Sequence, residues 1–245
     1  LKDIVCDAKD NLWAATSQGL FHVSADGKTI IRRNQDLYVN TTTIIDDDKL
    51  LVCSTTGAYL INTKVKGHDA KPSSITTLTT NNTETAYFDK GKGHIWLGTF
   101  NEGVLVFDAS SNKLLTNGMA TTIPHTPIRA IVPLNASTML IGIDGSGVFS
   151  AKKDGSDAKI LFSTDEKTGS VIHGNGIYDI LCDSHDNIWI GSYTGGVDIA
   201  HPTGDIMELY EHKRGNAQSL GCDGVNDIIE SGSFLVFATD NGISF

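Results

Sequence analysis

Three features that would each decide the class of this protein are missing from its sequence. No apolar run approaches the roughly 18 residues of a membrane-spanning helix, so the sequence predicts no such segment. Lysine and arginine form no cluster, and a formal net charge of -10 argues against a nucleic-acid backbone as a partner. Nor does any segment show the apolar period of an amphipathic helix. What remains is an acidic chain of 245 residues with many short apolar runs.

Motifs for catalysis and metal binding are also missing. The four cysteines and eight histidines show no Cys-x-x-Cys, His-Glu-x-x-His or paired-histidine spacing, and no Gly-x-Ser-x-Gly elbow occurs. We therefore expect no catalytic residue, no metal ion and no cofactor. The acids Asp7, Asp10, Asp183 and Asp186 could be read as Ca²⁺ ligands, but one turn offers few of the roughly six to eight oxygens required. Turn formation is the favoured role.

An internal repeat is the most informative feature that is present. Three stretches read almost alike, each with a tryptophan after a polar turn, and three weaker copies carry leucine or valine at the same place. These anchor positions are Trp13, Leu51, Trp96, Leu140, Trp189 and Val236. They are 38 to 49 residues apart, close to the roughly 40–50 residues of one propeller blade. We expect all six to pack in the core, because a core site accepts leucine or valine where an exposed stacking platform would not.

Within each repeat the pattern predicts four strands, separated by turns of Gly, Asn, Asp and Ser. Predicted strands include 104–107, 114–115, 128–132, 177–182, 206–210 and 225–229. Two residues after each anchor stands a small residue, which indicates close approach of a neighbouring sheet. These are Ala15, Cys53, Gly98, Gly142, Gly191 and Ala238. The turn after each second strand ends in glycine, at Gly19, Gly57, Gly103, Gly147, Gly196 and Gly242.

The sequence therefore predicts an all-β fold, a β-propeller of four-stranded antiparallel blades with six repeats visible in one domain, 1–245. The repeats run approximately over 1–40, 41–84, 85–127, 128–175, 176–223 and 224–245, the last incomplete. An unclosed propeller would expose strand edges, so we expect the chain to be part of a longer polypeptide.

The four cysteines are expected to be free thiols. Cys6 and Cys182 occupy the same first-strand site in non-adjacent blades, and Cys53 takes the small-residue site. Such sites should be farther apart than the roughly 7 Å between Cα atoms that a disulfide spans. We expect these three thiols to be buried, whereas Cys222 falls in a loop between repeats.

One run, Ile-Trp-Ile-Gly-Ser-Tyr-Thr-Gly-Gly-Val at 188–197, resembles the two-component regulator propeller repeat. Residues 95–99 with Gly103 and Val104 are similar, and 216–220 is similar to the family's Ser-Leu linker between blades. The second, fourth and sixth copies depart from the pattern because they lack the tryptophan. The resemblance extends over essentially the whole chain.

This resemblance implies a non-enzymatic sensor domain in the periplasm, belonging to a membrane-bound hybrid histidine kinase of Bacteroidetes whose kinase is a separate domain. In that family the repeats usually form two seven-bladed propellers followed by a β-sandwich. The expected partners are therefore the second propeller and β-sandwich of the parent chain, a second copy in a homodimer, and an oligosaccharide released by glycan breakdown.

Candidate ligand-binding residues are those that depart from the repeat in the loops joining second to third strands and joining blades. Packing alone would keep such positions alike, and both loop types emerge on one face. The candidates are Phe100, Asn101, Arg129, Asp144, His173, Asn175, Tyr178 and Tyr193. Two alternative functions stay open: a protein-docking propeller scaffold without a small ligand, and a propeller lyase.

Overall fold

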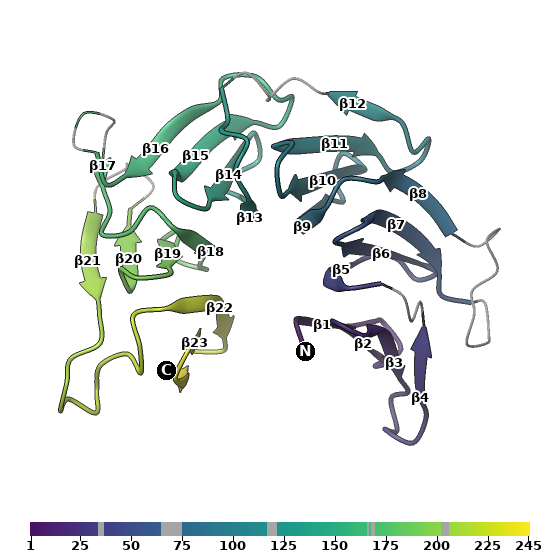
Figure 1. The fold of residues 1–245 in the computed structure, drawn as a ribbon, viewed down its shortest axis with the longest axis horizontal. Coiled ribbons are helices and arrows are strands. Elements are labelled where there is room, and N and C mark those ends of the chain that lie inside the picture. Colours follow the sequence, from purple (N-terminus) through teal and green to yellow (C-terminus); the bar gives the residue numbers. More distant parts are fainter. Residues whose placement is uncertain (34–36, 65–74, 117–121, 166, 168–169, 202–205) are drawn as a thin grey trace. The chain divides into compact units, whose positions relative to one another are not determined.

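The computed structural model describes residues 1–33, 37–64, 75–116, 122–165, 167, 170–201 and 206–245 (Figure 1). The chain divides into two compact units, Leu1–Asn117 and Gly118–Phe245, and each is described by itself. All regular elements of the described residues are β-strands. In this part of the chain no helix has the length and apolar character needed to cross a membrane.

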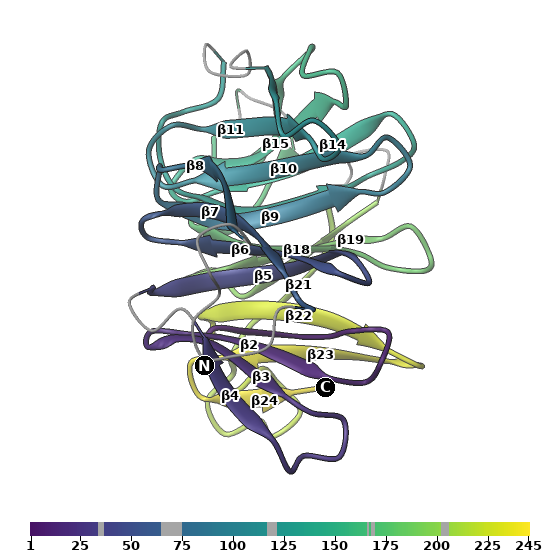
Figure 2. The same cartoon turned by 90° about the vertical axis from the view of Figure 1, so that its right-hand side faces the viewer.

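The first unit holds three antiparallel sheets, in each of which every strand pairs with the next along the chain. Blade 1 is β1 (Asp3–Cys6), β2 (Leu12–Thr16), β3 (Gly19–Val23) and β4 (Ile30–Arg33). Blade 2 is β5 (Val39–Asp46), β6 (Lys49–Ser54), β7 (Gly57–Asn62) and β8 (Ile75–Thr79). Blade 3 is β9 (Thr83–Asp89), β10 (His94–Thr99), β11 (Val104–Asp108) and β12 (Leu114–Thr116). These sheets stack on one another, with β5 against β1 and β2, and β9 against β5 and β6. Figure 2 shows β9 and β10 above β5 and β6.

The second unit also holds three sheets. Blade 4 is β13 (Ile128–Pro133), β14 (Thr138–Ile143), β15 (Gly147–Lys152), β16 (Lys159–Ser163) and β17 (Ser170–Val171). Blade 5 is β18 (Ile177–Cys182), β19 (Ile188–Ser192), β20 (Val197–Ala200) and β21 (Ile206–Tyr210). Blade 6 is β22 (Val225–Ser231), β23 (Phe234–Thr239) and β24 (Gly242–Ser244). The first strand of each blade packs on the first strand of the next, β13 on β18 and β18 on β22.

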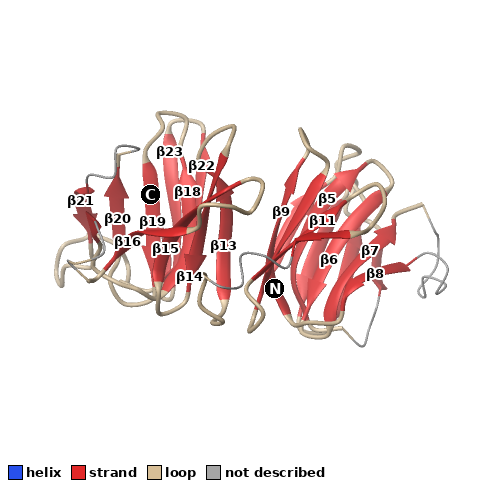
Figure 3. Ribbon diagram, turned by 90° about the horizontal axis from the view of Figure 1, so that it is seen from above, coloured by secondary structure: helices blue, strands red, loops and turns tan. Residues whose placement is uncertain are grey.

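The predicted all-β propeller fold is confirmed, and Figure 3 shows strands joined by loops throughout the described residues. The predicted strands 114–115 and 206–210 are β12 and β21. Two blades differ from the four-stranded pattern. Blade 4 gains β17, which pairs in parallel with β16 and is followed by the buried Ile172. Blade 6 has three strands among the described residues.

Small residues let neighbouring blades approach closely, as predicted. A Cβ atom at Gly142 of β14 would lie 2.7 Å from Cγ2 of Ile177 on the next blade. At Gly191 of β19 it would lie 3.0 Å from Cγ1 of Val225, again on the next blade. Both separations are shorter than ordinary carbon contacts, so these sites hold glycine because the next blade occupies the space.

Of the six anchor side chains, four are buried and two are half-buried. The buried ones are Trp13, Leu51, Trp96 and Leu140. Val236 and Trp189 are half-buried. The Trp189 indole packs beside Phe237, 5.9 Å between ring centroids, and Tyr210, at 6.1 Å.

The turn acids organise the turn before the anchor. Asp183 accepts hydrogen bonds from the backbone N–H groups of His185 and Asn187, both at 2.8 Å. Asp186 adopts a φ of 65°, which aspartate tolerates better than most residues. The first repeat has the same arrangement around Asp7 and Asp10, which supports the turn role. Among the described residues no group of three His, Cys, Asp or Glu side chains is placed to hold a metal ion.

The predicted burial of the cysteines is wrong for two of them. Cys6 is exposed and Cys182 is half-buried, because each is the last residue of a first strand, where the strand leaves the sheet packing. Cys53, in the middle of blade 2, is buried. Cys222 is half-buried, and all four are free thiols.

Candidate functional site

A β-bulge recurs near the start of the first strand in five blades. At each bulge the register with the second strand skips one residue, which re-aims the side chain of that residue. The skipped residues are Asn40, Glu84, Arg129, Tyr178 and Asn226. Two of the sequence candidates, Arg129 and Tyr178, therefore occupy bulges.

The residue directly after each second strand lies beside the bulge of the same blade. Its N–H donates to the carbonyl that closely precedes the first strand, from Asp144 to Pro127 at 2.9 Å and from Tyr193 to Gly176 at 2.9 Å. Asp240 repeats this bond in blade 6. Each blade of the second unit thus presents two adjacent side chains at the end where its second strand finishes.

In blades 4 and 5 these paired positions form one continuous row. Nη2 of Arg129 lies 3.1 Å from Oδ2 of Asp144, and its guanidinium carbon lies 5.3 Å from the centre of the Tyr178 ring. Tyr178 in turn stacks on Tyr193, with centroids 5.5 Å apart and an angle of 23° between the planes. We call Arg129, Asp144, Tyr178 and Tyr193 the blade 4–5 row. Its outer member, Tyr193, is 54% exposed.

A cavity of about 520 Å³ adjoins the row at Tyr193, within the second unit. Tyr193 is one of the lining residues, and the polar side chains of the lining include His212, Asp223, Asp240 and Asn241. Asp240 accepts a hydrogen bond from Nδ2 of Asn226, the bulge residue of blade 6, at 2.8 Å. The cavity therefore combines an aromatic surface with carboxylate and amide groups.

His173 and Asn175 lie in the linker between blades 4 and 5, and both bond to neighbouring strands. Nδ1 of His173 lies 2.6 Å from Oδ1 of Asp198, which is fully buried in β20. Oδ1 of Asn175 accepts from the N–H of Thr164 at 2.8 Å, and its Nδ2 donates to the Thr164 hydroxyl at 2.7 Å. These hydrogen bonds attach the linker to β20 and to the residue after β16.

Phe100 and Asn101 belong to the first unit, in the turn between β10 and β11. Phe100 directly follows its second strand, as Asp144 and Tyr193 do, and is 45% exposed. Its N–H makes the corresponding bond, to the carbonyl of Asn82 at 2.9 Å.

Sequence reasoning missed the polar residues that line the cavity, Thr194, His212, Asp223, Asp240 and Asn241. A signal for Asp240 was present, because it stands four residues after its anchor, as Asp144 and Tyr193 stand after theirs. The sixth copy is weak in sequence, so its departures from the repeat did not stand out.

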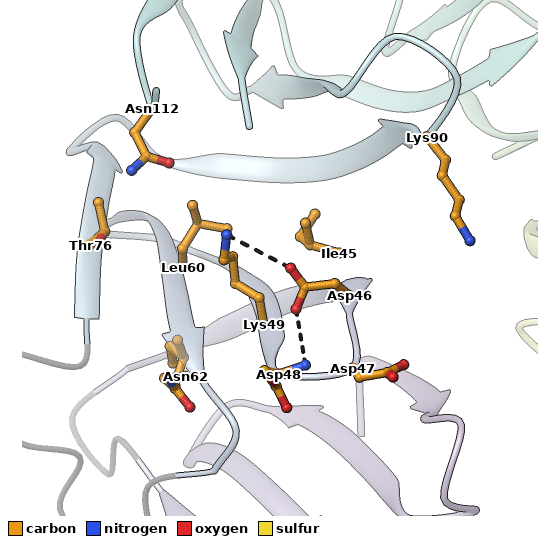
Figure 4. Close-up of a pocket in the computed structure, with 11 residues that line it drawn as sticks. Ile45, Asp46, Asp47, Asp48, Lys49, Leu60, Asn62, Thr76, Lys90 and Asn112 are labelled. Carbon is orange, nitrogen blue, oxygen red and sulfur yellow. Dashed lines mark hydrogen bonds and ion pairs between the residues drawn. The ribbon is translucent and has the colours of Figure 1, made fainter. Parts of the chain in front are cut away.

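A second cavity, of about 650 Å³, lies between blades 2 and 3 of the first unit (Figure 4). Ile45 and Leu60 contribute apolar surface, and three aspartates come from the last residue of β5, Asp46, and from the turn that follows it, Asp47 and Asp48. Asp46 accepts from the N–H of Asp48 at 2.9 Å and lies 3.8 Å from Nζ of Lys49. The carboxylate of Asp48 pairs with Nζ of Lys64, and no sequence candidate lies here.

The repeated four-stranded sheets place this chain in the class of β-propellers. In the blades of the second unit, the bulge residue and the residue directly after the second strand form a pair of side chains that differ from blade to blade. Several solved propellers share this fold. An extracellular domain ascribed to a hybrid two-component system of B. thetaiotaomicron matches with a TM-score of 0.63 at 17% identity, covering 98% of this chain and 39% of that one. PorZ, a surface component of the type-IX secretion system of Porphyromonas gingivalis, matches with a TM-score of 0.71 at 15% identity, covering 98% and 37%.

A luciferin-regenerating enzyme matches with a TM-score of 0.65 at 12% identity, covering 97% of this chain and 83% of that one. At these identities the likeness concerns the fold, which sensors, surface proteins and enzymes share. The chain spans less than two fifths of the length of the two bacterial surface proteins.

Residues 172–194 match the family model described as two-component regulator propeller. The matched segment runs from the linker through β18 and β19 and includes Tyr178 and Tyr193. The resemblance inferred from the sequence is thereby confirmed for the repeat of blade 5. None of the curated proteins matches this chain in sequence.

Proposed function

We propose that this chain is the periplasmic sensor propeller of a hybrid two-component histidine kinase and that its second unit binds an oligosaccharide. Two findings support the sensor role: the family match within blade 5, and the shared fold with an extracellular domain ascribed to such a system. The observation that carries ligand binding is the blade 4–5 row, which ends in the exposed Tyr193 beside a cavity whose lining includes carboxylate and amide side chains.

The chemistry of this place suits a sugar. A pyranose has one face of C–H groups and a rim of hydroxyls, so it can stack on an aromatic ring while bonding to polar groups around it. Tyr193 offers the ring, and Asp240 and Asn241 offer hydrogen-bond acceptors and donors. A cavity of about 520 Å³ is also in the size range of small-molecule sites.

The row is ordered before any ligand arrives. Arg129 forms an ion pair with Asp144 and a cation–π contact with Tyr178, and the Tyr178 ring stacks on the Tyr193 ring. Because a ligand stacking on Tyr193 would not need to order these side chains, little of its binding free energy would be lost. Signalling would follow if the ligand bound one arrangement of the parent protein more tightly than another. The parent's other domains and a second copy are the partners that would carry the change.

Isothermal titration of the full chain against a panel of neutral oligosaccharides tests the proposal. We expect one member to bind and Tyr193→Ala to weaken it by about tenfold, since an aromatic contact contributes roughly 0.5–1.5 kcal/mol beyond its buried area. The matched control is Phe234→Ala, which removes a 60% exposed aromatic side chain from β23 and should leave affinity unchanged.

Other outcomes would favour the alternatives. No heat with any oligosaccharide, together with capture of a defined protein partner, would favour the docking scaffold. Turnover of a separately added polysaccharide or macrolactone would favour the lyase. Equal weakening by Tyr193→Ala and Phe234→Ala would place the ligand outside the blade 4–5 row.

A further inference from the structure

Two pairs of neighbouring blades are joined by an aspartate on one first strand that bonds to the next first strand. In the first unit, Oδ2 of Asp3 accepts from the N–H of Thr42 at 2.9 Å and from the hydroxyl of Thr41 at 2.7 Å. In the second unit, Oδ2 of Asp179 accepts from the N–H of Ile228 at 2.8 Å. The backbone bond is therefore the same at both junctions.

The two aspartates are equivalent in the repeat, because each pairs with the small residue that follows its anchor by two positions. Asp3 pairs with Ala15, and Asp179 pairs with Gly191. The residues that face these aspartates on the next blade, Thr41 and Asp227, are also equivalent in the repeat, because each pairs with the small residue of its own blade. Thr41 pairs with Cys53 in blade 2, and Asp227 pairs with Ala238 in blade 6.

The junctions differ in the group that faces the aspartate. Thr41 supplies a hydroxyl that donates to Asp3, whereas Asp227 supplies a second carboxyl group to Asp179. An ionised carboxylate can only accept hydrogen bonds, so two ionised groups here would repel each other and leave Asp179 without its second donor. One of the two must carry a proton for the blade 5–6 junction to match the blade 1–2 junction.

The surroundings favour the protonated form. Burial, and then the negative charge of Asp227, raise the pKa of Asp179 to about 8. Asp179 is half-buried in β18, and Asp227 is exposed on β22, so solvent reaches one side of the pair. Of the strands packed against β18, β14 and β19 carry no ionisable residue. β13 carries Arg129, which is paired with Asp144, and β22 adds Glu230.

The other titratable side chains on β18 and β22 also contact groups other than Asp179. Glu230 accepts hydrogen bonds from the hydroxyl and the N–H of Ser184. On β18 itself the other titratable groups are Tyr178, stacked on Tyr193, and Cys182 at the far end of the strand. Among the residues of these strands Arg129 is the only Lys or Arg, and it is ion-paired with Asp144.

We propose that Asp179 and Asp227 form a proton-binding site, in which one carboxylic acid donates a hydrogen bond to the other carboxylate and so joins blades 5 and 6. One proton is bound per pair. Its release leaves two like charges facing each other between β18 and β22. Tyr178 and Asn226, the bulge residues of blades 5 and 6, directly precede the two acids in sequence. The proton site is therefore one residue further along each first strand than the bulge.

The sign of the pH effect follows from the raised pKa. The folded protein keeps the proton up to about pH 8, whereas the unfolded chain releases it near the ordinary aspartate value of about 4. Folding stability from this pair is therefore complete below about pH 4 and is lost as the pH rises to about 8. One linked proton changes the unfolding equilibrium constant by up to about tenfold per pH unit.

The test compares denaturant unfolding of the wild-type chain and Asp227→Thr across pH 4 to 8. This variant installs the hydroxyl that blade 2 uses, so Asp179 becomes an ordinary ionised acceptor. We expect the unfolding constant of the wild type, relative to the variant, to rise by at least about tenfold across this range. The matched control is Glu230→Gln, which removes another carboxylate from β22 and should keep the wild-type slope.

A direct readout is the ¹³C resonance of aspartate carboxyl groups in the labelled full chain. We expect one aspartate to titrate well above pH 5 in the wild type and none to do so in Asp227→Thr. If Asp227→Thr does not fold, Asp227→Asn supplies an amide donor and tests the same point. Identical pH slopes in the wild type and a folded variant, or wild-type aspartates that all titrate below pH 5, would overturn the proposal.

Discussion

At the residue scale, Asp183 shows how one carboxylate organises a blade. Its Oδ2 accepts from Nε1 of Trp189 at 2.8 Å and from Nδ2 of Asn187 at 2.9 Å, while Oδ1 accepts two backbone N–H groups. Burial alone would raise the pKa of Asp183, but these hydrogen bonds outweigh it and hold the pKa below its ordinary value. The folded state therefore favours the ionised form.

We expect Asp183→Ala to lower the free energy of unfolding at pH 7 by about 1–3 kcal/mol, because it leaves the Trp189 indole N–H without its acceptor. A lowered pKa contributes stability above the unfolded value of about 4, and that contribution disappears as the pH falls further. The difference between variant and wild type should therefore shrink between pH 5 and pH 2 in urea denaturation. Asp186→Asn, at an exposed position of the same turn, should change stability by less than about 0.5 kcal/mol. An Asp183→Ala deficit that stays constant with pH would contradict this assignment.

The same residues show what a repeat predicts and what it leaves out. Aspartate and asparagine in the turn before Trp189 predicted a turn, because they bond to their own backbone. The bond from Asp183 to the indole was not predicted, since it depends on where the twisted strand places a side chain six residues away. Comparison of the copies likewise marked Tyr178 and Tyr193 as exceptions, but their stacking arises from a bulge that composition does not reveal.

At the scale of the element, the turn between β19 and β20 depends on its last glycine. Gly196 has a φ of 73°, and a Cβ atom there would lie 2.2 Å from the carbonyl oxygen of Tyr210 on β21. Gly147 has the same conformation and would meet the carbonyl oxygen of Phe162 on β16 at 2.3 Å. The fourth strand thus packs directly over the glycine that ends the turn.

Gly196→Ala is expected to destabilise the protein more than Gly215→Ala. Both positions have positive φ, which costs a residue with Cβ about 1–2 kcal/mol. Only Gly196 adds a clash with backbone, because a Cβ at Gly215 would meet nothing within 4 Å. Thermal and denaturant unfolding should give a loss of at least about 3 kcal/mol for Gly196→Ala and about 1–2 kcal/mol for Gly215→Ala. Equal losses would mean that β21 can move away from the turn.

Elements with long apolar runs were predictable, and the shortest was not. β18 and β21 begin and end where the apolar runs of the repeat predicted. β17 has only two residues, and it pairs in parallel with β16, which no local pattern signals. Its place is set by the burial of Ile172, just as Leu220 is buried in the next linker.

At the scale of the whole molecule, the formal charge of -10 limits what can bind. The cavity beside Tyr193 is lined by Asp223 and Asp240, and the cavity of the first unit is lined by Asp46, Asp47 and Asp48. An anionic ligand would meet like charge at long range, and in the cavity beside Tyr193 it would also meet the carboxylates of Asp223 and Asp240 on contact. A neutral oligosaccharide would meet neither.

Salt dependence therefore separates a neutral sugar from a charged partner. The affinity for a neutral oligosaccharide should change by less than about twofold between 50 and 500 mM NaCl, because stacking on Tyr193 and hydrogen bonds to Asp240 involve no long-range attraction. A sulfated glycan of the same length should bind more weakly than its neutral counterpart at low salt. A basic protein docking on this acidic surface would instead lose affinity steeply as salt screens the attraction. Titrations at both salt concentrations, with wild type and Tyr193→Ala, distinguish the three cases, and steep salt dependence of binding would count against the neutral-sugar site.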